Sequence, residues 1–154
     1  MSNIVNTGNI ISYIDNDFQI QGDNGSTRGR VIYKFTLPPN NGNGGGGVIK
    51  INASNSNGDS DTSSSEEWVF SFWQRIFPPG ATSPAIRVFS NNNYLNDTVY
   101  DVSLFKVDDL MQFTIYCVAN ALTYDTYYGS VMIDFTFSEE IFFDSKQTDT
   151  INVV

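Results

Sequence analysis

The 154-residue chain contains no histidine and only one cysteine, Cys117. The lack of histidine excludes Ser-His-Asp and Cys-His catalysis, histidine-ligated zinc and the usual general base near neutral pH. A single cysteine excludes a disulfide within the chain. Cys117 falls on the apolar face of an expected strand, so we interpret it as a small buried hydrophobic residue.

Basic residues are scarce: eight lysines and arginines stand against 17 acidic residues, and the formal net charge is -9. The basic residues are scattered and form no stripe, which argues against nucleic acid and anionic membrane surfaces as partners. No apolar run approaches the ~18 residues of a membrane span, so we expect no membrane insertion. The first residues lack the features of a signal peptide, and we expect synthesis in a cytoplasm.

The sequence gives little support for catalysis by a pair of carboxylates, as in glycoside hydrolases. The four glutamates come as two adjacent pairs, Glu66-Glu67 and Glu139-Glu140. Neighbours on a strand point to opposite faces, so neither pair can flank one glycosidic bond. We therefore expect a protein that is not an enzyme and uses no cofactor.

The chain is rich in apolar residues (40%) and aromatic residues (14%), and these alternate with polar ones. The clearest alternation covers Val99–Val107, Met111–Ala119 and Val131–Phe137, which we expect to form a meander of three neighbouring strands. Such alternation is typical of strands with one face in a core. Val31–Leu37 and Trp68–Phe77 are further expected strands.

These segments predict an all-β fold in one domain spanning residues 1–154. The number and spacing of the strands favour an antiparallel two-sheet β-sandwich, jelly-roll-like, with eight or nine strands. We expect a hairpin or edge strand within residues 1–20, and flexible polar loops at about 40–47 and 54–65. A last strand at Ile141–Phe143 would precede a polar tail.

The segment Trp68–Phe77 is apolar on both faces. A two-sheet sandwich buries only one face of each strand, so the other face should be exposed. If one face lies in the core, Val69, Trp73 and Phe77 form an outer stripe. An exposed apolar stripe usually marks an interface. We therefore predict self-association, most simply as a homotrimer, with these three residues in the oligomer interface.

Four tyrosines stand near the expected ends of the sandwich: Tyr94, Tyr124, Tyr127 and Tyr128. They could pack the end of the core, contact another protein or form a sugar-binding platform, and the residues alone leave these alternatives open. We treat all four as candidate contacts to a receptor or partner.

Asn55–Glu66 spaces its oxygen-bearing side chains as a Ca²⁺-binding loop does. The match is incomplete, because Gly58 is two positions too early, the first residue is asparagine and no helix is expected on either side. We expect a solvated loop and no metal site.

Four segments occur in an order that resembles the β-sandwich head or tip domains of phage and other viral fibres. They are Arg30–Pro38, Val48–Ser54 after a glycine-rich turn, Val99–Phe105 and Met111–Val118. The resemblance implies a virion structural protein, either capsid-associated or a fibre head, located in the virion. Its partners would be copies of itself, other virion proteins and a host receptor or surface glycan. The alternative is a lectin-like glycan-binding module.

Overall fold

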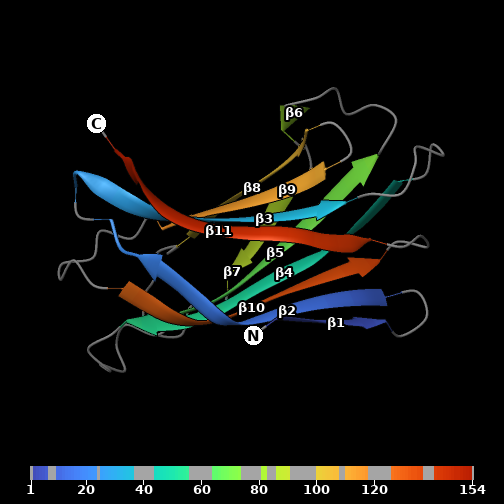
Figure 1. Cartoon of the computed structure of the whole chain (residues 1–154), viewed down its shortest axis with the longest axis horizontal. Coiled ribbons are helices and arrows are strands. Elements are labelled where there is room, and N and C mark those ends of the chain that lie inside the picture. Colours follow the sequence, from blue (N-terminus) through green and yellow to red (C-terminus); the bar gives the residue numbers. More distant parts are fainter. Residues whose placement is uncertain are drawn as a thin grey trace.

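The computed structural model describes residues 2–6, 10–23, 25–36, 44–55, 64–73, 81–82, 86–90, 100–107, 110–117, 126–136 and 141–153. These residues contain strands and no helix, so none of them belongs to a helix that could cross a membrane. The strands form two antiparallel sheets packed face to face, which confirms the predicted β-sandwich (Figure 1).

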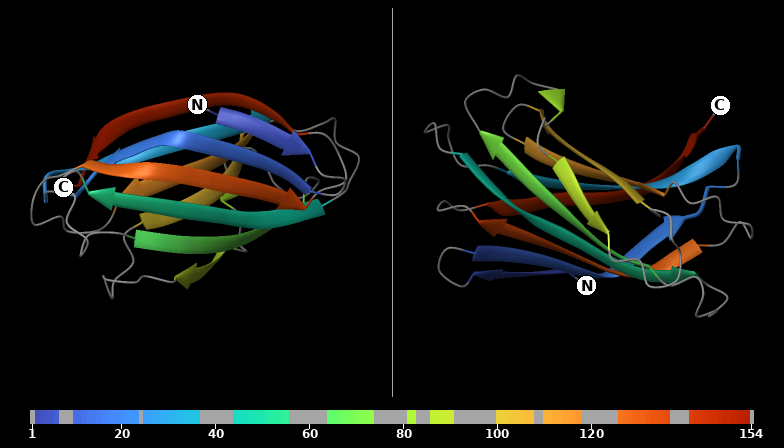
Figure 2. Two further views of the ribbon diagram at one scale, coloured as in Figure 1. Left: turned by 90° about the horizontal axis from the view of Figure 1, so that it is seen from below. Right: turned by 180° about the vertical axis from the view of Figure 1, so that it is seen from behind.

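The first sheet holds, in spatial order, β1 (Ser2–Asn6), β2 (Ile10–Gln21), β10 (Thr126–Thr136), β4 (Gly44–Asn55), β5 (Ser64–Trp73) and β7 (Ile86–Ser90). The second sheet holds β11 (Phe142–Asn152), β3 (Thr27–Thr36), β9 (Leu110–Cys117), β8 (Tyr100–Val107) and β6 (Ala81–Thr82). The eight longest strands divide equally, four in each sheet, and β1, β6 and β7 extend the edges. Figure 2 (left) shows β2, β10, β4 and β5 side by side.

The core lies between the sheets and follows the predicted alternation. The inward residues of β3, β9 and β10 are buried as expected, including Cys117, and the buried face of β8 carries Tyr100, Val102 and Leu104. At its centre, four phenylalanine rings from both sheets meet edge to face with centroids 5.0–6.0 Å apart: Phe35, Phe70, Phe113 and Phe135. Such contacts add to the area that the rings bury, so they stabilise the packing of one sheet on the other.

The predicted three-strand meander is wrong in one respect. β8 and β9 do pair, but β9 pairs next with β3, and β10 lies in the other sheet between β2 and β4. Each of these strands has one apolar face. In a sandwich that face is buried equally well whether two successive strands lie in the same sheet or in opposite sheets. Alternation therefore identified the faces of the strands but not their neighbours.

Two segments predicted as irregular are strands. Gly44–Gly47 belongs to β4, where a Cβ on Gly47 would overlap the carbonyl oxygen of Asp134 on β10. Glycine is thus required here by the close approach of two strands rather than by a loop. The predicted polar tail after Phe143 is part of β11, which pairs with β3 over its whole length. β11 is polar because it lies at a sheet edge and is mostly exposed.

Candidate functional site

A β-bulge in β2 shapes the outer face of the first sheet. The pairing of β10 with β2 shifts from Gly129–Phe18 to Val131–Asp15, so β2 has one residue more than β10 here. The backbone N–H of Asp17 donates to Asp15 Oδ1 at 2.9 Å and holds the bulge. As a result, Asp15 and Phe18 both point into the core, whereas Asn16 and Asp17 are exposed.

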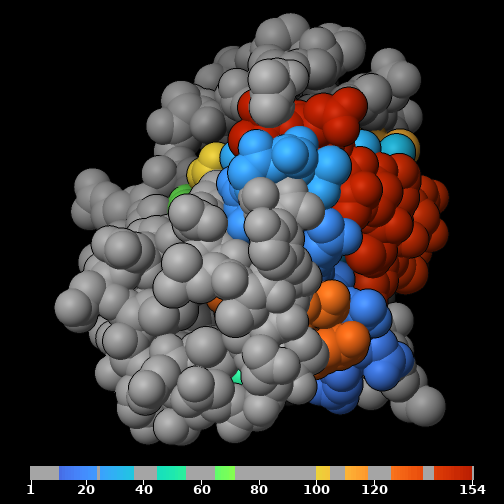
Figure 3. Space-filling view, turned by 90° about the vertical axis from the view of Figure 1, so that its left-hand side faces the viewer, coloured from blue at the N-terminus to red at the C-terminus, as the bar shows by residue number. Residues whose placement is uncertain are grey.

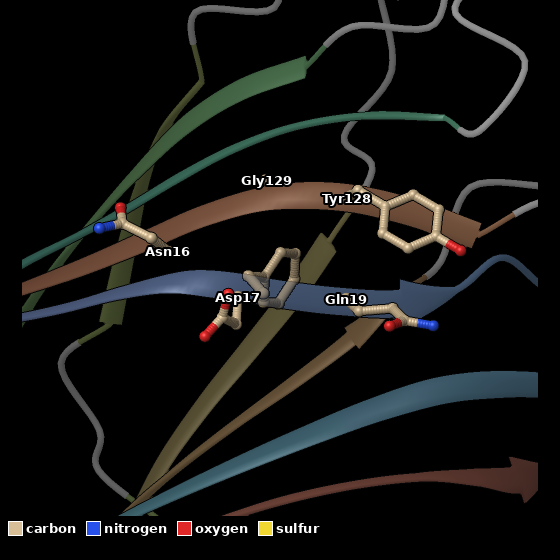
Figure 4. Close-up of a pocket in the computed structure, with 6 residues that line it drawn as sticks. Asn16, Asp17, Gln19, Tyr128 and Gly129 are labelled. Atoms are coloured by element: carbon tan, nitrogen blue, oxygen red, sulfur yellow. The ribbon is translucent and has the colours of Figure 1, made fainter. Parts of the chain in front are cut away.

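Beside this bulge lies a cavity of about 350 Å³. Its lining comes from two neighbouring strands: Asn16, Asp17, Phe18 and Gln19 of β2, and Tyr128 and Gly129 of β10. Tyr128 is 48% exposed and pairs directly with Gln19 across the strands, so the ring and the amide lie next to each other (Figure 4). Figure 3 shows the start of β10 (orange) at the surface beside β2 (blue).

Behind the bulge, Asp15 is buried at 2% exposure and is fully engaged. Its Oδ2 accepts a hydrogen bond from the Tyr33 hydroxyl at 2.6 Å and pairs with Lys146 Nζ at 2.6 Å. Lys146 also donates to the carbonyl oxygen of Asp17 at 3.0 Å. Burial, and secondarily the bond to Asp15, raises the pKa of Tyr33, so its hydroxyl stays a donor. This cluster ties β2 to β3 and β11.

The cavity is polar without being basic. Its polar side chains are two amides, one carboxylate and one phenol. Lys146 approaches from the other side of β2, and its ammonium group is bound to Asp15 and to the Asp17 carbonyl. Among the described lining residues, therefore, the donors and acceptors suit hydroxyl groups and not an anion.

A second feature of the same face is a diagonal band of apolar residues across four strands. Ile14 pairs with Met132, and Val48 pairs with Val69. All four point away from the core, because their neighbours in the chain are buried, and all four are partly exposed. We call these four residues the outer band. It crosses β10 at Met132, near the middle of the strand and four residues beyond Tyr128.

The predicted interface stripe is only partly within the described residues. Val69 lies on the outer face of β5, with Trp68 and Phe70 buried on the other side, as the alternation implied. The backbone of Trp73 pairs with Gly44, but its side chain and all of Phe77 lie outside the described part. The interface itself stays a prediction.

The four candidate tyrosines do not share one environment. Tyr127 is 3% exposed and meets Tyr100 with ring centroids 6.3 Å apart, so it belongs to the core and is not available to a partner. Tyr128, the next residue along β10, points the other way and lines the cavity. Tyr94 and Tyr124 lie outside the described residues.

No group of metal-ligating side chains occurs among the residues whose positions the structure gives. Residues 56–63 of the predicted calcium-like loop fall outside them. The glutamate at the end of that loop, Glu66, is buried and accepts a hydrogen bond from the backbone N–H of Tyr100 at 3.1 Å. It bridges the two sheets.

Of the polar residues that line the cavity, the sequence pattern indicated Tyr128 but not Asn16, Asp17 or Gln19. A signal for them exists in the phase of the β2 alternation. Ile11 and Tyr13 are inward at odd positions, whereas Phe18 and Ile20 are inward at even positions. Such a change of phase indicates a bulge between them, and the polar residues 15–17 mark its place.

No known protein family, no curated protein and no solved structure matches the chain.

Proposed function

We propose that the protein is a non-enzymatic structural subunit of a virion, which self-associates and either sits on a capsid or forms the head of a fibre. The β-sandwich agrees with the resemblance to viral head domains. The observation that carries the self-association is the outer band, which is apolar and partly exposed although the core is complete without it.

Several properties of the outer band fit an assembly contact. It crosses β2, β10, β4 and β5, so it spans the width of the four central strands. Lys50 and Glu67 lie beside it with Nζ and Oε1 3.8 Å apart, both more than one-third exposed. An apolar centre with a polar rim is the usual composition of a protein interface. We expect a homotrimer, because the head domains that the chain resembles are commonly trimeric.

Sedimentation equilibrium tests the assembly. We expect a mass about three times the 17.2 kDa of one chain. Val69→Asp should dissociate the oligomer, because a charge would have to be buried at the contact. Asn52→Asp is a matched control, since Asn52 is exposed on the same face and the change adds the same charge.

A clean monomer at high concentration would exclude self-association. If both variants dissociate equally, the contact does not use the outer band. The virion location has a separate test, which is a search for peptides of this chain in purified virus particles by mass spectrometry. Their absence from every particle preparation would reject that part of the proposal.

A further inference from the structure

We propose that the cavity between the β2 bulge and the start of β10 binds a neutral saccharide, with a sugar ring stacked on Tyr128. This inference rests on the proposed function, because it names the chemical class of receptor that the subunit would contact. Its centre lies on a different part of the surface from the outer band: Tyr128 and Met132 are four residues apart on β10, or about 13 Å. The two regions approach each other on β2, where Ile14 is two residues from Asn16.

Tyr128 supplies an exposed aromatic ring at this site. Most aromatic side chains that the structure describes lie in the core, whereas Tyr128 is 48% exposed on the outer face of a central strand. A tyrosine ring offers an apolar face together with a hydroxyl that bonds to polar groups. A pyranose ring needs both, because it has an apolar face of C–H groups and a rim of hydroxyls.

The polar part is the set of side chains that line the cavity, of which Gln19 lies beside the ring whereas Asn16 and Asp17 lie farther along β2 (Figure 4). Gln19 stands directly opposite Tyr128, and Asn16 and Asp17 complete the lining. A side-chain amide donates and accepts hydrogen bonds, and a carboxylate accepts at two oxygens, so these groups match the alternating donors and acceptors of vicinal hydroxyls. A ligand site usually combines an apolar surface with a small number of polar groups.

Polar residues continue from the site across β4. On the far side of Tyr128, Ser54 of β4 is its direct partner, and Asn52 pairs with Ser130. Asn52 is exposed, and Ser54 and Ser130 are partly so. These residues continue the polar surface across β4 without a charged group among them. A short oligosaccharide could therefore run across the strands from the cavity.

Charge selects among saccharides. The lining contains Asp17 and no basic residue, and the Lys146 ammonium is bound to the buried Asp15. The whole chain carries a net charge of -9. A sialylated, sulfated or phosphorylated sugar would be repelled and would find no cationic partner here. Neutral hexoses and N-acetylhexosamines have no such penalty.

The lining is also held in place before any ligand binds. The bulge that exposes Asn16 and Asp17 is fixed by the Asp17 N–H bond to Asp15, and Lys146 holds the Asp17 carbonyl. Because the backbone of the lining is ordered in advance, binding loses less conformational entropy.

The test is a printed array of neutral, sialylated and sulfated oligosaccharides, probed with the full chain. Titration calorimetry with the best neutral oligosaccharide then compares variants. We expect binding to neutral glycans only, at least a tenfold loss of affinity in Tyr128→Ala and a smaller loss in Tyr128→Phe. Gln19→Ala should also weaken binding. Phe142→Ala is the matched control, because Phe142 is a 55% exposed aromatic residue on β11.

Three results would overturn the inference: no bound glycan, binding confined to acidic glycans, or equal affinity in Tyr128→Ala and Phe142→Ala. Its failure can be told from failure of the proposed function. An oligomer found in virus particles that binds no glycan would overturn the saccharide site alone. A monomer absent from particles that binds neutral glycans through Tyr128 would overturn the virion role alone.

Discussion

Asp15 is the residue that anchors β2 of the first sheet to the second sheet. It is buried, and it joins Tyr33 of β3 and Lys146 of β11 to the first sheet. A buried carboxylate that loses its partner keeps the full penalty of desolvation, whereas removing both charges together removes that penalty. The cluster therefore behaves as a unit, and its members should not contribute independently.

We predict that Asp15→Ala lowers the free energy of unfolding by about 3 kcal/mol, as for other broken buried pairs. Lys146→Met should also destabilise the fold, because it leaves the Asp15 carboxylate without a counter-ion. The double variant Asp15→Leu with Lys146→Met should lose clearly less than the sum of Asp15→Leu and Lys146→Met alone. Urea unfolding of the four proteins measures this coupling. Additive losses would show that Asp15 and Lys146 act separately.

A second charged pair predicts how stability depends on pH. The Arg30 guanidinium donates two hydrogen bonds to Asp149, at 2.8 and 2.6 Å, and these bonds lower the pKa of that carboxyl below its usual 3.8. A lowered pKa in the folded state stabilises the protein above pH 3.8, and this contribution disappears as the pH falls through the folded-state value.

We therefore expect Asp149→Asn to lose up to about 1 kcal/mol at pH 7, since both side chains are about 30% exposed and solvent screens the pair. The difference between the variant and the original protein should shrink as the pH falls from 3.8 through the lower folded-state pKa. Urea unfolding at pH 7 and at a series of acidic pH values checks it. A difference that persists at low pH would mean that Asp149 acts by packing rather than by charge.

At the scale of elements, β4 is unusual because it begins with glycines. Gly46 and Gly47 are buried between β5 and β10, and a Cβ on either would overlap a backbone carbonyl of a neighbouring strand. Glycine normally weakens a strand because it has no side chain to pack. Here that absence allows three strands to approach closely.

We predict that Gly47→Ala destabilises the fold by more than 2 kcal/mol, because β10 has to move away from β4. Gly25→Ala is the comparison. Gly25 has a φ of +87° but nothing within 4 Å of an added Cβ, so only backbone strain of about 1 kcal/mol applies. Thermal melting ranks the two variants. Equal losses would show that the contact at Gly47 is relieved by small shifts.

The strands also show which features of the fold can be predicted from the sequence. Alternation correctly identified the inward faces of β3, β9 and β10, because one face of each is buried in a continuous core. For β8 it separated the two faces but did not indicate which one is inward. It failed for β11, whose faces are both largely exposed at a sheet edge, and for the glycines of β4, which have no side chains to alternate. It could not find the cavity, because Gln19 and Tyr128 meet only through the pairing of β2 with β10.

At the scale of the whole molecule, we predict that stability does not depend on Ca²⁺. The loop at residues 55–66 resembles a calcium site in spacing alone, and its last oxygen ligand, Glu66, is turned into the sandwich. We expect melting temperatures in EDTA and in millimolar Ca²⁺ to agree within about 2 °C. A tight site would stabilise the folded state by mass action, so a large upward shift in Ca²⁺ would contradict this expectation.

The arrangement of the strands also has a consequence for the chain as it is being made. One edge of β3 pairs with β11 and one edge of β2 pairs with β10, and each partner follows about a hundred residues later. At 5 to 20 residues per second, a ribosome needs roughly 5 to 20 s to supply them. During that interval the nascent protein exposes the edges and apolar faces of two strands. Whether the nascent chain avoids aggregation then depends on chaperones or on the mutual repulsion of its acidic residues.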